Sequence, residues 1–216
     1  YLAMMAFCTG ASGAAIFIPY LITLMYLLIS GLYMRSPRSL ENWVFAFASQ
    51  LYIALPFALM NVLAFRMQSG VDGMSGLAYI PALPLGLMIF LWTNDMGAYC
   101  FGSMLQRFVP FKLFPSVSPH KSWIGSIGGG LVTVAAAVIM SRYFTFMPPV
   151  QWVGMALVVV VFGTWGDLVE SLLKRNLGVK DSGRFLPGHG GVLDRFDSSL
   201  LAIPAVVLYL YTLEIM

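Results

Sequence analysis

Residues 150–166 read VQWVGMALVVVVFGTWG, and residues 167–175 continue without a break as DLVESLLKR. The first stretch predicts a membrane helix, because about 20 apolar residues cross the hydrocarbon core of a bilayer. In the second stretch, polar side chains recur at the spacing of one helix face: Asp167, Glu170, Ser171, Lys174 and Arg175. We therefore expect a single helix that carries a polar face at the end where it leaves the membrane.

Five further apolar runs surround this helix: residues 13–34, 43–65, 77–93, 123–141 and 198–214. The runs are continuous rather than alternating, which predicts helices and not strands. Three consecutive glycines at 128–130 lie inside one run and predict close packing against another helix. The chain begins at Tyr1, so we expect an N-terminal segment to be missing and the first residues to be the remnant of a further helix.

The composition excludes several classes of protein. Hydrophobic residues make up 59% of the chain and charged residues 10%, whereas soluble domains carry roughly 25% charged residues. The apolar excess excludes disorder, and a net charge of +3 provides no basic surface for nucleic acid. The expected fold is an all-α polytopic membrane bundle of about six to eight transmembrane helices. It forms one transmembrane domain over residues 1–216, with a polar cavity facing the cytoplasm.

The basic residues predict the orientation of the chain in the membrane. If the six runs all cross, the connections 35–42, 94–122 and 167–197 lie on the same side. They contain most of the basic residues, namely Arg35, Arg38, Arg107, Lys112, Lys121, Lys174, Arg175, Lys180, Arg184 and Arg195. Lys and Arg concentrate in cytoplasmic loops, so we expect these connections to face the cytoplasm.

The connection 167–197 is also where most acidic residues lie, and its composition points to phosphate chemistry. Residues 187–191 read PGHGG, a turn whose glycines and amides can surround an anion. Asp194 and Asp197 add carboxylates, the oxygen ligands that Mg²⁺ prefers. No His and Cys cluster has the spacing of a zinc site. The pattern therefore predicts Mg²⁺-dependent phosphoryl or nucleotidyl transfer to a lipid phosphate.

A second polar patch precedes the fourth run. Asp95 and Tyr99 are one helical turn apart, and the segment Ser118-Pro119-His120-Lys121-Ser122 follows on the same predicted side of the membrane. By itself Asp95 is more typical of a helix end than of a ligand, and Lys121 is more typical of a membrane-surface anchor.

Residues 171–197, SLLKRNLGVKDSGRFLPGHGGVLDRFD, resemble the signature of the phosphatidate cytidylyltransferases, also called CDP-diacylglycerol synthases. The preceding GDLVE at 166–170 also resembles that family, and weaker matches are found at 95–102 and 118–121. The sequence departs from the family pattern at a few positions, where it has Ser103, His120, Ser122 and Ile124.

The resemblance implies a membrane enzyme that joins phosphatidic acid and CTP into CDP-diacylglycerol and pyrophosphate. It implies Mg²⁺ bound by Asp167 and Asp194, K⁺ sharing the metal site, contact with membrane lipids, and a homodimer. N-terminal helices then occupy residues 1–90, and the catalytic part occupies 91–216.

The expected site residues fall into three groups. Those expected to act on phosphates in catalysis are Lys174, Arg175, Lys180, His189 and Arg195. Those expected to bind substrate are Asp95, Tyr99, Ser118, Lys121, Ser171, Gly190 and Gly191. Additional candidate metal ligands are Glu170, Asp181 and Asp197.

Two other functions fit parts of the pattern. Charged groups among membrane helices also occur in ion-coupled transporters, but here they concentrate at one predicted face. A CTP-dependent polyprenol or dolichol kinase uses the same nucleotide. We expect the bacterial inner membrane as the location, with the active site facing the cytoplasm.

Overall fold

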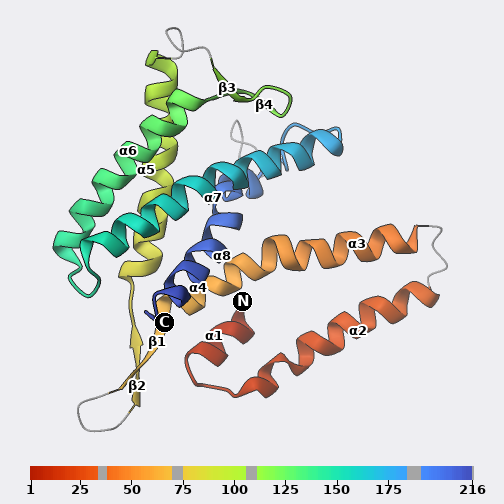
Figure 1. The fold of residues 1–216 in the computed structure, drawn as a ribbon. Coiled ribbons are helices and arrows are strands. Elements are labelled where there is room, and N and C mark those ends of the chain that lie inside the picture. Colours follow the sequence, from red (N-terminus) through yellow and green to blue (C-terminus); the bar gives the residue numbers. More distant parts are fainter. Residues whose placement is uncertain (34–37, 70–74, 106–110, 184–190, 216) are drawn as a thin grey trace. The chain divides into compact units, whose positions relative to one another are not determined.

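The computed structural model describes residues 1–33, 38–69, 75–105, 111–183 and 191–215, and most of them are helical (Figure 1). The chain divides into two compact units, Tyr1–Pro81 and Ala82–Met216, and each unit is described by itself. The expectation of one transmembrane domain stays a prediction.

The first unit contains helices followed by a β-hairpin. Its elements are α1 (Leu2–Cys8), the 3₁₀ helix η1 (Ala14–Phe17), α2 (Ile18–Tyr33), α3 (Ser39–Ser49), the π-helical turn η2 (Gln50–Ala54), α4 (Leu55–Ala64), β1 (Phe65–Ser69) and β2 (Ser75–Tyr79). The indole Nε1 of Trp43 donates to the carbonyl of Leu27 at 3.1 Å, which joins α3 to α2.

The second unit contains every described residue of the predicted site. Its elements are α5 (Ala82–Leu105), β3 (Lys112–Phe114), β4 (Ser118–Ser122), α6 (Trp123–Tyr143), α7 (Pro149–Asn176), η3 (Leu193–Arg195) and α8 (Asp197–Thr212). Trp152 of α7 is fully buried, and its ring meets that of Phe90 of α5 edge-on with 6.2 Å between centroids.

Among the described residues, four helical segments are long and apolar enough to cross a membrane: Ala14–Tyr33, Ser39–Ala64, Trp123–Tyr143 and Pro149–Asn176. They confirm four of the six predicted runs as long helices. The run 198–214 forms the shorter apolar helix α8. The described residues therefore support a mainly helical membrane protein with fewer qualifying spans than the sequence predicted.

Two predictions about secondary structure need correction. The run 77–93 does not form one helix, because residues 77–79 belong to β2 and α5 begins at Ala82. Pro81 explains this start, since a proline favours extended backbone in the residue before it. The chain is also not purely α, because β1 pairs with β2 and β3 pairs with β4 in antiparallel hairpins. Each hairpin is short and connects helices, so apolar run length did not reveal it.

Glycines set the distances between the helices of the second unit. A Cβ atom on Gly129 of α6 would lie 2.6 Å from the backbone oxygen of Asn94 in α5. A Cβ on Gly166 of α7 would lie 2.7 Å from the backbone oxygen of Asp197 at the start of α8. The predicted packing role of the glycines at 128–130 is confirmed at Gly128 and Gly129, which are buried against α5. These contacts bring the polar ends of the helices together.

We predict that Gly129→Ala lowers the free energy of unfolding by about 1–3 kcal/mol, because the new methyl group forces α5 and α6 apart. Thermal unfolding of the purified protein in detergent measures the change. Gly13→Ala is the matched control, because no atom lies within 4 Å of a Cβ placed there. Equal midpoints for the two variants would contradict the close packing.

Candidate active site

The last turns of α7 contribute the acidic and basic side chains of the site. Glu170 is buried, with 1% of its surface exposed, whereas Leu172 and Leu173 are 46% and 40% exposed. The helix thus directs a carboxylate inward and leucines outward, the reverse of a helix in water. This arrangement suits a helix surrounded by lipid.

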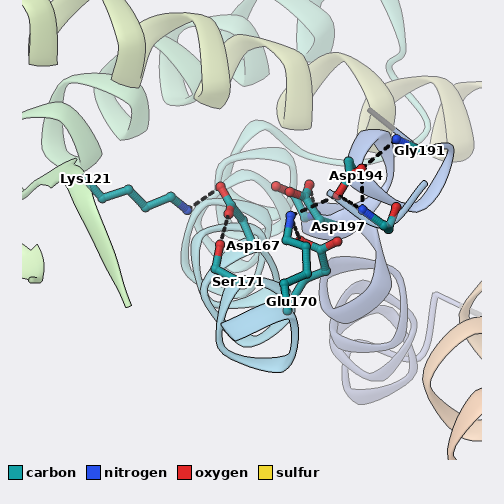
Figure 2. A network of polar contacts seen from close by, with 10 residues as sticks. Lys121, Asp167, Glu170, Ser171, Gly191, Asp194 and Asp197 are labelled. Atoms are coloured by element: carbon teal, nitrogen blue, oxygen red, sulfur yellow. Dashed lines mark hydrogen bonds and ion pairs between the residues drawn. The ribbon is translucent and has the colours of Figure 1, made fainter. Parts of the chain in front are cut away.

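Asp167 is paired with a lysine from the segment that precedes α6. The Nζ of Lys121 lies 2.5 Å from Oδ2 of Asp167 and donates to the carbonyl of Thr164 at 3.4 Å. The hydroxyl of Ser171 donates to Oδ1 of the same aspartate at 3.3 Å. Figure 2 shows Lys121 reaching Asp167 from β4. Two segments that are far apart in sequence therefore meet at Asp167.

Lys174 lies between two carboxylates. Its Nζ is 2.6 Å from Oε2 of Glu170, one helical turn earlier on α7, and 2.9 Å from Oδ1 of Asp194 on η3. One ammonium group thus joins α7 to the segment before α8.

Asp194 accepts hydrogen bonds at both carboxylate oxygens. Besides Lys174, the amide of Ser182 donates at 3.2 and 3.0 Å, and the amide of Gly191 donates at 2.7 Å. Burial by itself raises the pKa of Asp194, but these donors outweigh it and keep the pKa well below its ordinary value. Asp194 is therefore ionised at neutral pH and connects Ser182 and Gly191 to α7.

A cavity of about 520 Å³ opens beside the Lys121–Asp167 pair. It lies among α5, the end of β4, α6 and α7, and its lining comprises Asn94, Asp95, Ala98, Tyr99, Gly102, Ser103, Lys121, Ser122, Gly125, Ser126, Thr164 and Asp167. Its size is in the range of ligand-binding cavities. Hydroxyl groups, the ammonium group of Lys121 and the carboxylates of Asp95 and Asp167 make this a polar cavity.

The acidic side chains lie close enough to repel one another. Burial raises the pKa of Asp197, and the negative charges of Asp167, Glu170 and Asp95 raise it further. Oε2 of Glu170 is paired with the ammonium group of Lys174, whereas Oε1 has no hydrogen-bond partner among the described residues. Within the same residues, no three His, Cys, Asp or Glu side chains form a ready-made metal centre. The donors fit a hard cation such as Mg²⁺, which takes one or two protein carboxylates and fills its other positions with water and phosphate oxygens.

The structure places the predicted residues in different surroundings. Asp95, Tyr99 and Lys121 line the cavity. Ser118 lies on β4 opposite Phe114, outside that lining. Outside the lining, Arg175, Lys180, Asp181 and Arg195 are exposed. His189 and Gly190 lie outside the described residues.

Several lining residues were not predicted from the sequence. Ser122 caps α6, since the Gly125 amide donates to its hydroxyl at 3.2 Å, and a serine directly before an apolar run is a typical helix cap. Thr164 precedes Asp167 by one helical turn, and Asn94 interrupts an apolar run beside Asp95. A search for polar residues in and next to the predicted helices could have identified these positions from the sequence.

In EDTA-treated protein, we expect Asp194→Asn to lower the free energy of unfolding by about 1–3 kcal/mol, because an amide cannot accept the same hydrogen bonds. The folded pKa of Asp194 lies below the unfolded value of about 3.9. Its contribution is thus complete above that pH and is lost as the pH falls through the folded pKa. The difference in unfolding free energy between wild type and variant, measured by thermal unfolding, should be the same at about pH 5.5 and about pH 7.5. A difference that shrinks markedly between these pH values would contradict the lowered pKa.

Comparison with known proteins identifies the family. The model of the Cytidylyltransferase family matches residues 1–213. A phosphatidate cytidylyltransferase of Staphylococcus aureus (strain COL) is 36% identical, over 78% of this chain and 71% of its own. That of Staphylococcus haemolyticus is 35% identical over the same shares, and that of Staphylococcus epidermidis (strain ATCC 12228) is 34% identical over 87% of this chain and 77% of its own. The chain therefore belongs to the cytidylyltransferase family.

Proposed function

We propose that this enzyme transfers the cytidylyl group of CTP to phosphatidic acid in phospholipid biosynthesis. The observation that carries the proposal is the family match over residues 1–213, supported by relatives named phosphatidate cytidylyltransferase. A phosphate oxygen of the lipid attacks the α-phosphorus of CTP. The bond from that phosphorus to the bridging oxygen breaks, and pyrophosphate leaves while CDP-diacylglycerol remains in the membrane.

This reaction needs no strong general base. A phosphate monoester has a second pKa of about 6, so the lipid phosphate is largely a dianion at neutral pH. The protein then has to position two anionic substrates and neutralise their charge. We therefore assign His189, with Gly190 and Gly191, to shaping the turn and contacting a phosphate rather than to removing a proton.

The basic residues are assigned to the phosphates. Lys121 lines the cavity, and Lys174 contacts Asp194, which also accepts from the amides of Ser182 and Gly191. The other cations in the predicted set, Arg175, Lys180 and Arg195, are exposed on and after α7. Ser171, Asp95 and Tyr99 are proposed to orient the substrates, and Ser118 to contact a phosphate.

Asp167 and Asp194 are proposed to bind Mg²⁺, with K⁺ at the same site and Asp181, Asp197 and Glu170 as further candidate ligands. When bound, Mg²⁺ neutralises charge on the triphosphate and on the leaving pyrophosphate. Lys121 now neutralises Asp167, and Lys174 now neutralises Asp194. These pairings support the assignment, because both carboxylates already have a positive charge beside them.

The proposal also includes that the chain crosses the membrane six times, that its active site faces the cytoplasm and that it forms a homodimer. Bacterial relatives support the inner membrane as the location. The concentration of basic residues on the connections 35–42, 94–122 and 167–197 supports their cytoplasmic location.

We predict that CTP labelled at the α-phosphate transfers its label to phosphatidic acid in mixed micelles. EDTA should stop the transfer and added Mg²⁺ should restore it, because the phosphates need a divalent counter-ion. Extraction into organic solvent and assay of pyrophosphate measure the two products. Release of CDP with unlabelled lipid would instead indicate a polyprenol kinase type of enzyme. Absence of any product, with active controls, would favour the transporter.

Asp167→Ala and Asp194→Ala should each reduce turnover by at least about 100-fold, because each removes a proposed metal ligand. Size-exclusion chromatography in detergent should show a folded protein for both variants. Near-normal activity of folded Asp194→Ala would remove that residue from the metal site.

Lys121→Met should raise the KM for an anionic substrate by about 10-fold or more, because it removes the ammonium group from the cavity. The substrate whose KM rises, CTP or phosphatidic acid, identifies the phosphate that Lys121 contacts. Unchanged kinetics for both substrates would contradict the role of the cavity.

A further inference from the structure

Glu170 is an acidic side chain buried within a helix that is apolar enough to cross a membrane. Its side chain is 1% exposed, and an ionised group at such a position is costly unless it is paired. Lys174 supplies the pairing, with 2.6 Å between Nζ and Oε2. An ordinary pair one turn apart on an exposed helix contributes only about 0.2–0.5 kcal/mol. The burial of Glu170 therefore suggests a purpose beyond helix stability.

The partner of Glu170 extends the interaction to another segment. Lys174 also donates to Oδ1 of Asp194 at 2.9 Å. Asp194 in turn accepts from the amides of Ser182 and Gly191. The order of contacts thus runs from Glu170 through Lys174 and Asp194 to two amides of the connection after α7. Figure 2 shows Glu170, Asp194 and Gly191, the labelled members of this succession, close to one another.

The position of Lys174 depends on Glu170 for a physical reason. A lysine side chain carries its charge on a flexible four-carbon stem. A contact with Asp194 alone therefore does not fix the conformation of the Lys174 side chain. Glu170 lies on the same helix, and its carboxylate limits the ammonium to the region between the two acids. Since the Lys174 side chain is itself only 17% exposed, water does not easily replace either carboxylate.

We infer that Glu170 is a positioning residue, which keeps Lys174 and, through it, Asp194 and the amides of Ser182 and Gly191 in the geometry that meets a substrate phosphate. The inference rests on the proposed function for its kinetic consequence, but the structural consequence is independent of turnover. The positioning role differs from the role of metal ligand that the sequence predicted for Glu170. A metal ligand would contact the cation directly, whereas a positioning residue acts through Lys174.

The first test is hydrogen–deuterium exchange of EDTA-treated protein. Glu170→Gln keeps the shape of the side chain and removes its charge. We expect the amides of Ser182 and Gly191 to exchange at least about 10-fold faster than in the wild type, because their acceptor Asp194 loses its fixed partner. Peptides from α6 should exchange at the wild-type rate. Glu41→Gln, the same change at an exposed residue of α3, should leave the whole pattern unaltered.

The second test is kinetic and separates positioning from metal binding. Glu170→Gln should lower kcat by about 10- to 100-fold, the usual cost of a misplaced catalytic group. The Mg²⁺ concentration that gives half the maximal rate should stay within about twofold of the wild-type value. Glu170→Asp should recover part of the loss. The double variant Glu170→Gln/Lys174→Met should be no slower than Lys174→Met alone, because both changes interrupt the same contacts.

Each outcome decides the question. Unchanged exchange at Ser182 and Gly191 in Glu170→Gln would overturn the positioning role. So would a large rise in the Mg²⁺ requirement without faster exchange, or additive losses in the double variant. If Glu170→Gln does not fold, Glu170→Asp and Lys174→Met provide the same exchange comparison. A wild-type protein without cytidylyl transfer would overturn the proposed function instead, and the exchange result would still stand.

Discussion

The ammonium group of Lys174 is the link between α7 and the segment that leads into α8. It lies within 3 Å of carboxylate oxygens from Glu170 and Asp194, and one of these acids is almost completely buried. Without the lysine, two negative charges would face each other in a poorly hydrated place, which is unfavourable by several kcal/mol. The attachment of Ser182 and Gly191 to α7 therefore depends on a charge balance at the end of the helix.

The charge balance requires helix ends that approach closely, and small residues provide this approach. Gly166 lets the start of α8 lie against α7 next to Asp167, and Gly129 lets α6 lie against α5 next to Asn94. Larger side chains at these positions would separate the helices and widen the gap between Lys121 and Asp167. Packing in the apolar part of the bundle thus determines distances in the polar part, which is why a substitution far from any phosphate can still affect the site.

Much of the fold followed from the sequence because run length and continuity reflect the thickness of a bilayer. The helix around residues 150–175 and its polar face were predictable for this reason. The hairpins were not, since their strands are short and join helices. Sequence spacing could suggest the pair of Glu170 and Lys174, but not the contact with Asp194, which lies 20 residues from Lys174. Periodicity relates residues within one helix, and it does not place a residue of α7 relative to one on η3.

The pairing of lysines with carboxylates also bears on how two anionic substrates could meet. CTP and phosphatidic acid repel each other, so a site for both needs positive charge that is already in place and does not have to be brought from water. In the absence of ligands, bare lysines at a membrane surface would be mobile and would repel each other. Here Asp167 fixes Lys121, and Glu170 and Asp194 fix Lys174. On the proposed function, Asp167 and Asp194 would hold Mg²⁺, which would supply charge neutralisation, and Lys121 and Lys174 would contact phosphate. Asp167 and Asp194 would then have two roles, to position the lysines and to bind the metal. Glu170 would remain the partner that holds Lys174 in place when Asp194 binds the metal.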